Sequence, residues 1–322
     1  LIDSYVTKCY FSTYKFRQIN RENKMLPFKD LSYWEKQEFI EQIDVAIVGS
    51  GIVGMTTALA LKRAQHEVKV VIIERGYLPT GASTKNAGFT CFGSPTELMD
   101  DLKSMREADV WETVAMRYEG LKRLFELVPP EQMKYEACGS WDLLRDKQTL
   151  EPDFIAYLNK EIKRITGHES CYRMDQDKIH SAGFAGFTSA YLNRLEGSIH
   201  TNLLVDQLHQ RCVAAGVKFL FQTAVQAVEP SDSAVQLETS QGVLAAKKVV
   251  VCTNGFAKQL LPVDVEPARA QVLVTSVIPN LKVRGTFHLD HGYYYFRNVG
   301  DRILLGGGRN LDFNAENTFA ME

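Results

Sequence analysis

Apolar and polar positions along residues 43–74 change period twice, and each period predicts one element. Val45, Ile47 and Val48 belong to a β-branched run typical of a buried strand. After a glycine-rich turn, apolar residues recur at helical spacing, and a second apolar run follows over residues 68–73. The segment therefore predicts a strand, a tight turn, a helix and a second strand.

The turn of this unit carries Gly49, Gly51 and Gly54, and Glu74 follows at the end of the second strand. In a dinucleotide-binding βαβ unit the glycines allow a tight turn, close approach to a pyrophosphate and close helix–strand packing. The helix N-terminus attracts the anion, and a carboxylate at Glu74 can accept hydrogen bonds from ribose hydroxyls. An ordinary βα unit can also contain a glycine turn, but the full context favours dinucleotide binding. The βαβ unit alone does not distinguish NAD from FAD as the cofactor.

Composition and charge are those of an ordinary globular protein. The 322 residues are 45% hydrophobic and 24% charged, which is enough for two domains with their own cores. A net charge of −2 and a pI near 6.4 argue against a nucleic-acid or anionic-membrane partner. No apolar run approaches the roughly 20 residues of a membrane span, so we expect a soluble chain.

The six cysteines are scattered and form no CxxC pair, and the seven histidines are dispersed. This pattern argues against a metal site and a disulfide framework, and it favours a reducing, cytoplasmic compartment.

Residues 1–24 are basic, which is typical of a targeting arm. We favour the alternative that translation starts at Met25, because the chain opens on Leu1. Further periodic segments predict the remaining elements. We expect helices over residues 31–43, 98–128, 153–166 and 203–216, and strands over residues 135–144, 217–228, 234–244 (a meander), 248–255, 293–297 and 302–306.

The loop after Glu74 is rich in small and amide residues, from Arg75 through GASTKNAG at residues 81–88. Such residues suit close backbone approach to a flat ligand, although a flexible surface loop is the alternative. The motif resembles the flavoprotein family of D-amino-acid oxidase, glycine oxidase, sarcosine oxidase and the γ-glutamylputrescine oxidases, most of all the last branch. The resemblance implies FAD, held without a covalent bond because Lys85 stands where some relatives carry the attaching histidine. The implied cofactor residues in this loop are Glu74, Arg75, Ser83, Thr84, Asn86, Ala87 and Gly88.

The resemblance also implies a fold and further contacts. A Rossmann-like α/β domain with a β-meander would bind FAD, with Val225 near the adenine and Thr253 and Gly255 at a second strand end. An α+β substrate domain with an antiparallel sheet would complete the fold. The expected segments are 1–30 (extension), 31–98, 197–265 and 303–322 (FAD-binding domain), and 99–196 and 266–302 (substrate domain).

Alternation over residues 293–297 places Tyr293, Tyr295 and Arg297 on one strand face. A guanidinium between aromatic rings can hold a substrate carboxylate, although an arginine packed on a surface strand gives the same pattern. In glycine oxidase-like relatives the arginine at the matching place binds the substrate carboxylate. His288 and its neighbours Asp290 and His291 could line the same mouth.

The resemblance implies an FAD-dependent enzyme that oxidises the C–N bond of a small amine or amino acid. Hydride would pass to flavin N5 and give an imine, with oxygen or another electron acceptor regenerating the flavin. One alternative is a dehydrogenase of the same family that passes electrons to a quinone or carrier. Another is a non-catalytic flavin-binding fragment, because family members continue beyond the helical turn expected at residues 317–322.

Overall fold

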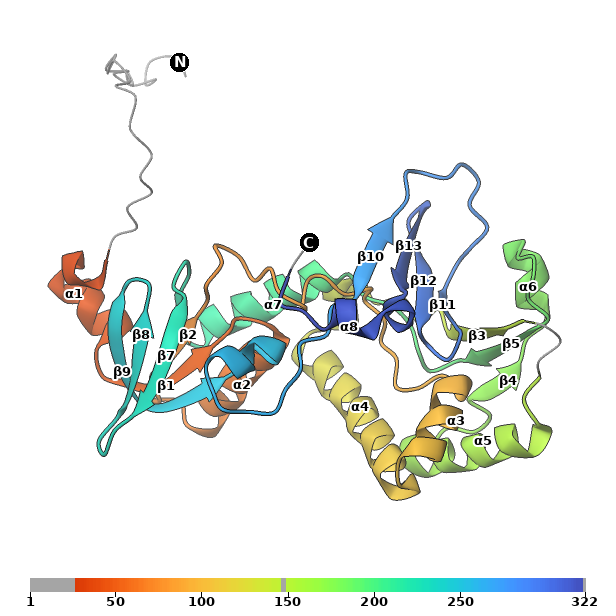
Figure 1. Cartoon of the computed structure of the whole chain (residues 1–322), viewed down its shortest axis with the longest axis horizontal. Helices are drawn as coiled ribbons and strands as arrows, with labels where there is room; N and C mark the ends of the chain where they lie inside the picture. Colours follow the sequence, from red (N-terminus) through yellow and green to blue (C-terminus); the bar gives the residue numbers. More distant parts are fainter. Residues whose placement is uncertain (1–26, 146–148, 321–322) are drawn as a thin grey trace, which may run out of the picture.

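A computed structural model describes residues 27–145 and 149–320 of the chain. Within these ranges the chain forms two sheets at opposite ends of the long axis, with helices packed around each (Figure 1). This arrangement confirms the predicted fold class. The expectations for the basic arm and for Met25 lie outside the described residues.

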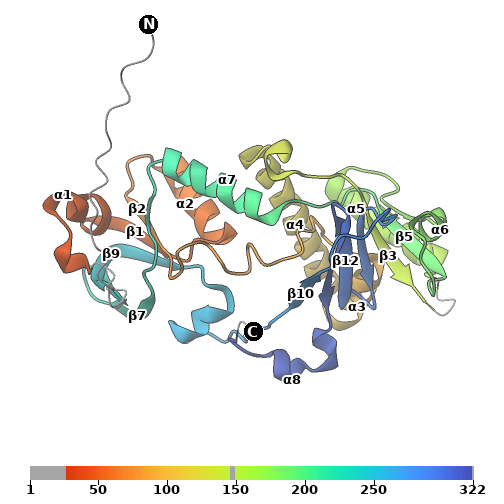
Figure 2. The same ribbon diagram turned by 90° about the horizontal axis from the view of Figure 1, so that it is seen from above.

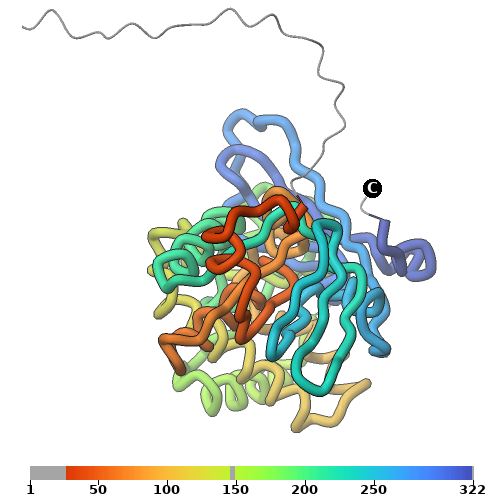
Figure 3. Tube along the Cα trace, turned by 90° about the vertical axis from the view of Figure 1, so that its left-hand side faces the viewer, coloured from red at the N-terminus to blue at the C-terminus, as the bar shows by residue number. Residues whose placement is uncertain are grey.

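The first sheet has six strands in the order β6-β2-β1-β9-β8-β7 within the described ranges. β1 pairs in parallel with β2 and β9, and β2 pairs in parallel with β6, while β8 runs antiparallel to β7 and β9. The meander lies beside the βαβ unit (Figure 3). The strands are β1 (Ile43–Val48), β2 (Val70–Ile73), β6 (Lys218–Leu220), β7 (Val225–Pro230), β8 (Val235–Thr239) and β9 (Gly242–Val251).

Both faces of the parallel strands are buried, which explains their continuous apolar runs. Ile47 and Val70 face a core shared with α2 (Ile52–Ala64) and α7 (Thr201–Ala214). Ala46 belongs to the core on the other face, which the meander covers. Seen from above, α2 and α7 lie side by side (Figure 2).

The second sheet has seven strands in the order β10-β13-β12-β11-β3-β5-β4, counted over the same described ranges. Its pairs are antiparallel except for β11 with β3. The strands are β3 (Ser140–Leu144), β4 (Tyr172–Met174), β5 (Ser189–Asn193), β10 (Gln271–Val274), β11 (Thr286–Leu289), β12 (Tyr294–Val299) and β13 (Arg302–Gly307).

Helices α3, α4 and α5 gather beside this sheet (Figure 1). Trp111 of α4 and Leu158 of α5 share one core with Tyr172 of β4. The remaining helical segments are short. The helices are α1 (Tyr33–Glu35, continued by a π-helix over Lys36–Ile40), α3 (Pro95–Ser104), α4 (Glu107–Leu127), α5 (Pro152–Thr166), α6 (Asp177–Ala182) and α8 (Phe313–Glu316), with 3-10 turns at Phe28–Asp30, Pro130–Met133, Asn254–Gln259 and Arg309–Leu311.

Several sequence-based expectations differ from the structure. The strand expected at 135–144 forms only over Ser140–Leu144, and the strand expected at 248–255 ends at Val251 and is followed by a 3-10 turn at Asn254–Gln259. The strand expected at 217–228 is two strands, because Gln222 adopts a left-handed φ of 54° and the chain crosses the end of β2. The helix expected at 98–128 breaks at Met105, whose backbone is extended. Of the helical turn expected at 317–322, residues 317–320 are not helical, and residues 321 and 322 lie outside the described residues. A short helix, α8, begins earlier at Phe313, where the Asp312 side chain accepts from Ala315 N.

Gly120 lies in α4, and a Cβ added there would meet no atom within 4 Å. Alanine restricts the unfolded chain more than glycine does and favours the helix. We expect Gly120→Ala to raise the free energy of unfolding by about 0.5–1 kcal/mol. Urea denaturation of both proteins measures this difference, and a destabilised variant would contradict it.

Candidate functional site

The turn between β1 and α2 leaves no space for side chains at two of its glycines. Gly49 has a φ of 105°, and a Cβ there would lie 2.6 Å from the carbonyl oxygen of Cys252. A Cβ on Gly54 would lie 2.0 Å from the carbonyl oxygen of Gly49. The turn therefore depends on backbone that approaches backbone directly.

Ser83 meets this turn at the N-terminus of α2. Its Oγ accepts a hydrogen bond from Ile52 N at 3.0 Å, and a Cβ on Gly51 would lie 2.8 Å from the same oxygen. The first amides of a helix lack intrahelical partners and bind anions. The Ser83 hydroxyl thus marks a polar position suited to a phosphate oxygen.

Glu74 connects the end of β2 to the glycine turn. Its Oε2 accepts from Ser50 N at 3.1 Å and from Ser50 Oγ at 2.7 Å, and its Oε1 accepts from Gly76 N at 2.9 Å. A carboxylate offers about four lone-pair sites, so capacity remains for a ribose hydroxyl.

The loop that contains Ser83 is folded upon itself by Asn86. The Asn86 amide nitrogen donates to the carbonyls of Ala82 and Ser83 at 3.0 Å, and its oxygen accepts from Gly88 N at 2.8 Å. Thr84 Oγ1 donates to Pro79 O at 3.0 Å. These bonds within the loop give it a defined shape.

The loop ends against the segment that precedes α7. Gly88 has a φ of 72°, and a Cβ there would lie 2.5 Å from the Ile199 carbonyl oxygen. Ile199 N donates to Gly88 O at 2.8 Å, and Ala87 beside it is buried. Thr201 Oγ1 donates to Thr84 O at 3.3 Å.

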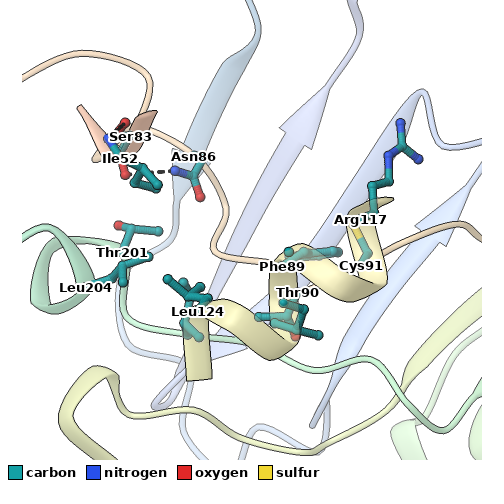
Figure 4. Close-up of a pocket in the computed structure, with 13 residues that line it drawn as sticks. Ile52, Ser83, Asn86, Phe89, Thr90, Cys91, Arg117, Leu124, Thr201 and Leu204 are labelled. Carbon is teal, nitrogen blue, oxygen red and sulfur yellow. Dashed lines mark hydrogen bonds between the residues drawn. The ribbon is translucent and has the colours of Figure 1, made fainter. Parts of the chain in front are cut away.

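A pocket of about 260 Å³ lies on one side of this loop (Figure 4). Its volume is slightly below the roughly 300–1,000 Å³ typical of ligand pockets, so it encloses only part of a dinucleotide. Of the predicted site residues, Ser83 and Asn86 line this pocket and the others do not. The lining residues are Ile52, Ser83, Asn86, Phe89, Thr90, Cys91, Arg117, Gly120, Leu121, Leu124, Ile199, Thr201 and Leu204.

Sequence analysis missed the α4 wall of this pocket. Arg117, Gly120, Leu121 and Leu124 occupy one helical face at spacings of three and four residues. This spacing is visible in the sequence, but it is equally typical of a helix face that packs only against the hydrophobic core.

The second predicted strand end lies against the glycine turn. Cys252 N donates to Val48 O at 2.8 Å, and the Thr253 methyl lies 3.6 Å from a Cβ built on Gly49. The buried Thr253 Oγ1 has no hydrogen-bond partner among the described residues. It is a polar atom that a bound group could satisfy.

The other residues predicted at this edge surround the same region. Thr223 N donates to Glu74 O at 2.9 Å, which brings the partly buried Val225 at the start of β7 towards Glu74. The Arg75 guanidinium lies 4.1 Å from the centre of the Phe256 ring. A Cβ on Gly255 would lie 3.0 Å from Pro267 Cα.

Arg297 reaches from β12 of the second sheet to the end of the loop. Its Nη2 donates to Ile199 O at 2.9 Å and lies 3.0 Å from a Cβ built on Gly88. Burial lowers its pKa, and its Nε lacks a hydrogen-bond partner in the described part of the chain. A buried guanidinium with an unused donor suits an anionic group.

The two predicted tyrosines differ in position. Tyr295 lies on β12 two residues from Arg297, and its ring is 5.7 Å from the Phe89 ring, edge to face. Tyr293 precedes the strand, is 45% exposed and contacts Phe313 instead. The structure therefore brings Arg297 and Tyr295, but not Tyr293, to the loop.

The histidines upstream of β12 separate in the same way. His288 is buried on β11, with its ring 5.2 Å from that of Phe89. His291 follows a turn at Asp290, and its Nδ1 lies 2.8 Å from an Asp100 carboxylate oxygen. Only His288 approaches the loop.

Glu196 is a buried acid behind the pocket that sequence analysis did not single out. Its Oε1 accepts from Phe92 N at 2.8 Å and from Gly93 N at 3.1 Å. Burial raises its pKa to about 7, and the nearby His288 opposes that rise. Nothing in its local sequence, Leu195-Glu196-Gly197, distinguishes it from a surface acid.

We expect the Glu196 carboxyl to make stability depend on pH. Because its folded-state pKa lies above the ordinary value of 4.5, its contribution is present below pH 4.5 and is lost as pH rises through about 7. At about 1.4 kcal/mol per pKa unit, the loss amounts to a few kcal/mol. Urea denaturation from pH 4.5 to 8 should show this fall in the wild type and a flatter profile for Glu196→Gln; parallel profiles would contradict it.

The fold and the site together define the class of protein. A glycine turn at a helix N-terminus, an acid at the end of the next strand and a shaped loop facing a second sheet are the parts of a two-domain dinucleotide-binding oxidoreductase. The sequence pattern of the FAD dependent oxidoreductase family matches residues 44–321. The chain belongs to this family, whose cofactor is FAD.

Two curated relatives and one solved structure illustrate the similarity. "Probable oxidoreductase OrdL" of Rhizobium meliloti is 27% identical over 85% of this chain and 65% of its own length. Gamma-glutamylputrescine oxidoreductase of Escherichia coli is 25% identical over 89% of this chain and 68% of its own length. L-proline dehydrogenase from P. horikoshii superposes with a TM-score of 0.65 at 16% identity, over 84% of this chain and 70% of that one.

The chain thus spans about two-thirds of the length of these relatives. No helix in the described ranges is both long and apolar enough to cross a membrane.

Proposed function

We propose that this protein binds FAD without a covalent bond and oxidises the C–N bond of an amine or amino acid. The observation that carries the proposal is that two distant segments meet the glycine turn: the Thr253 strand end at Gly49, and Ser83 at Ile52 N. Their convergence forms one anion-binding edge beside a shaped loop.

Residues of the first sheet would hold the adenine half of FAD. The amides at the start of α2 and the Ser83 hydroxyl suit the pyrophosphate, and Glu74 suits the adenosine ribose. Val225 and Arg75 border the region next to Glu74. We propose that this sheet, with α2 and α7, is the FAD-binding domain, and that the seven-stranded sheet is the substrate domain.

The loop from Thr84 to Gly88 would hold the ribityl chain and flavin ring, together with Thr253 and Gly255, which follow the end of β9. When bound, the flavin supplies a hydride acceptor at N5. The protein's part is to position the substrate and exclude water, and an amine that enters neutral requires no side-chain base.

Arg297 would bind the carboxylate of an acidic substrate. Its Nη2 donates one N–H to the Ile199 carbonyl, which leaves Nε and the second N–H of Nη2 for the planar, bidentate contact that carboxylates prefer. Tyr295 and Phe89 would shield that contact from water. One relative and one structural neighbour are named for γ-glutamylputrescine and L-proline, and these names support an amine or amino-acid substrate.

An absorbance spectrum of the purified protein with added FAD tests cofactor binding. Anaerobic bleaching by a panel of amines and amino acids then identifies the substrate. A protein that stays colourless would support the alternative of a non-catalytic fragment.

The electron acceptor and the compartment are tested separately. Peroxide release compared with dye reduction distinguishes oxygen from a quinone or carrier. The scattered cysteines, which are free where the structure describes them, support a cytoplasmic location, which cell fractionation would test.

A further inference from the structure

A single carboxylate fixes the segment that leaves the flavin loop. Residues 88–90 pair with residues 197–199, since Thr90 N donates to Gly197 O at 2.9 Å and Phe89 forms a β-bridge with Ser198. Immediately beyond, Glu196 accepts from two further backbone amides of the same segment, at positions 92 and 93. The position of Phe89, which lines the pocket, therefore depends on the residues that flank it on both sides.

Glu196 and His288 each have one buried polar atom without a partner. These atoms are Oε2 of Glu196 and Nε2 of His288, and neither forms a hydrogen bond to the residues that the structure describes. Both side chains are almost fully buried. His288 contacts the Phe89 ring edge to face, and the Phe89 ring contacts Tyr295 in the same way. His288 therefore lies one ring behind the pocket wall, and it interacts electrostatically with Glu196.

Other titratable groups face this pair from each neighbouring element. Glu97 of α3 has its Oε2 3.9 Å from His288 Nδ1. Asp142 pairs in register with His288 on the next strand and accepts from Thr96 N at 2.8 Å. Tyr172 of β4 donates to Gly93 O at 2.7 Å. Cys91 of the same segment and Tyr135 near the bridge also interact electrostatically with Glu196.

In this environment, the charge of Glu196 affects how firmly its carboxyl holds the backbone at residues 92 and 93. An ionised carboxylate with an unpaired buried oxygen is unfavourable, so conformations that admit water to Oε2 become favourable. A proton on the carboxyl removes the charge and leaves Oε1 free to accept from both amides. The protonated form therefore keeps the segment closed, and ionisation favours its opening.

We propose that Glu196 is a positioning residue for the flavin site, which holds Phe89 in place through its protonated carboxyl and its neighbour His288, so that FAD affinity falls when Glu196 ionises. The inference rests on the proposed function, because it requires FAD to bind beside Phe89. It adds Glu196 as a residue that contacts neither substrate nor cofactor and acts through Phe89.

The test is the dissociation constant of FAD, measured by fluorescence quenching on the cofactor-free protein between pH 5.5 and 8.5. We expect wild-type affinity to weaken several-fold as pH rises through about 7, with a slope below the tenfold per pH unit that one proton allows. Glu196→Gln carries a neutral side chain of the same shape, and we expect it to bind FAD with wild-type low-pH affinity across the range. Glu112→Gln, an exposed position on α4, is the matched control and should keep the wild-type profile.

The outcomes separate this inference from the proposed function. Absence of FAD binding in the wild type would overturn both. Binding with a flat wild-type profile, or with the same pH dependence in Glu196→Gln, would overturn the role of Glu196 alone. We expect His288→Gln to shift the midpoint of the wild-type profile, and an unchanged midpoint would remove His288 from the pair. Glu196→Ala, which loses the acceptor, should bind FAD more weakly than Glu196→Gln at every pH.

Discussion

Gly54→Ala is expected to abolish FAD binding and to lower the free energy of unfolding by about 3 kcal/mol. The added methyl would lie 2.0 Å from the Gly49 carbonyl oxygen, so the backbone of the turn would have to move. Such movement displaces the amides at the start of α2 and breaks the close contact of Gly49 with Cys252. Flavin absorbance after incubation with FAD, together with urea denaturation, measures both effects.

Gly120→Ala provides the matched control for this variant. It is the same change in another helix, at a position with open space around it. Because Gly120 lines the pocket, the variant is a control for stability, and we expect its free energy of unfolding to rise rather than fall. Wild-type flavin content in Gly54→Ala would show that the turn does not contact the cofactor. Lower stability in both variants would point to a general effect of glycine substitution.

Arg297→Ala is expected to reduce kcat/KM for substrates with a carboxylate by roughly 10²-fold, because removing one partner of a buried charged pair costs a few kcal/mol. Amines without a carboxylate should lose much less. The absorbance spectrum must show that FAD remains bound, since Arg297 also donates to the Ile199 carbonyl beside the loop. Steady-state kinetics on matched substrates with and without the carboxylate measure the difference.

Two arginine variants sharpen this test. Arg297→Lys keeps the charge but loses the planar fork, so we expect only partial activity. Arg302→Ala removes an exposed arginine from the adjacent strand of the same hairpin, where Nη1 donates to Thr275 O, and should behave as the wild type. Equal loss for substrates with and without a carboxylate would remove Arg297 from substrate recognition.

Local patterns in the sequence predicted the elements whose boundaries are set by nearby residues. The βαβ unit followed from a buried run, three glycines and an acid, and α5 ends at Gly167 as expected, with φ 76° at its C-cap. The hairpin of β12 and β13 also matches, because alternation and a short polar turn are local features.

Features that depend on pairing across the sheet were not predictable in the same way. The strands β6 and β7 are separated by only a few residues, yet they occupy opposite edges of the first sheet. An apolar run shows that residues are buried, but it does not show which strand they pair with. The side chains that share one face of the second sheet, such as His288 and Asp142, come together only through register.

The sequence by itself determined the family resemblance, the nucleotide-binding unit and the loop chemistry, because each is written in consecutive residues whose types and spacing carry the information. Only the tertiary structure decided which distant groups meet: Arg297 with Ile199, Ser83 with the start of α2, and Glu196 with Phe92. These contacts join residues far apart in the chain, and their geometry follows from strand order, register and burial, which no local pattern specifies.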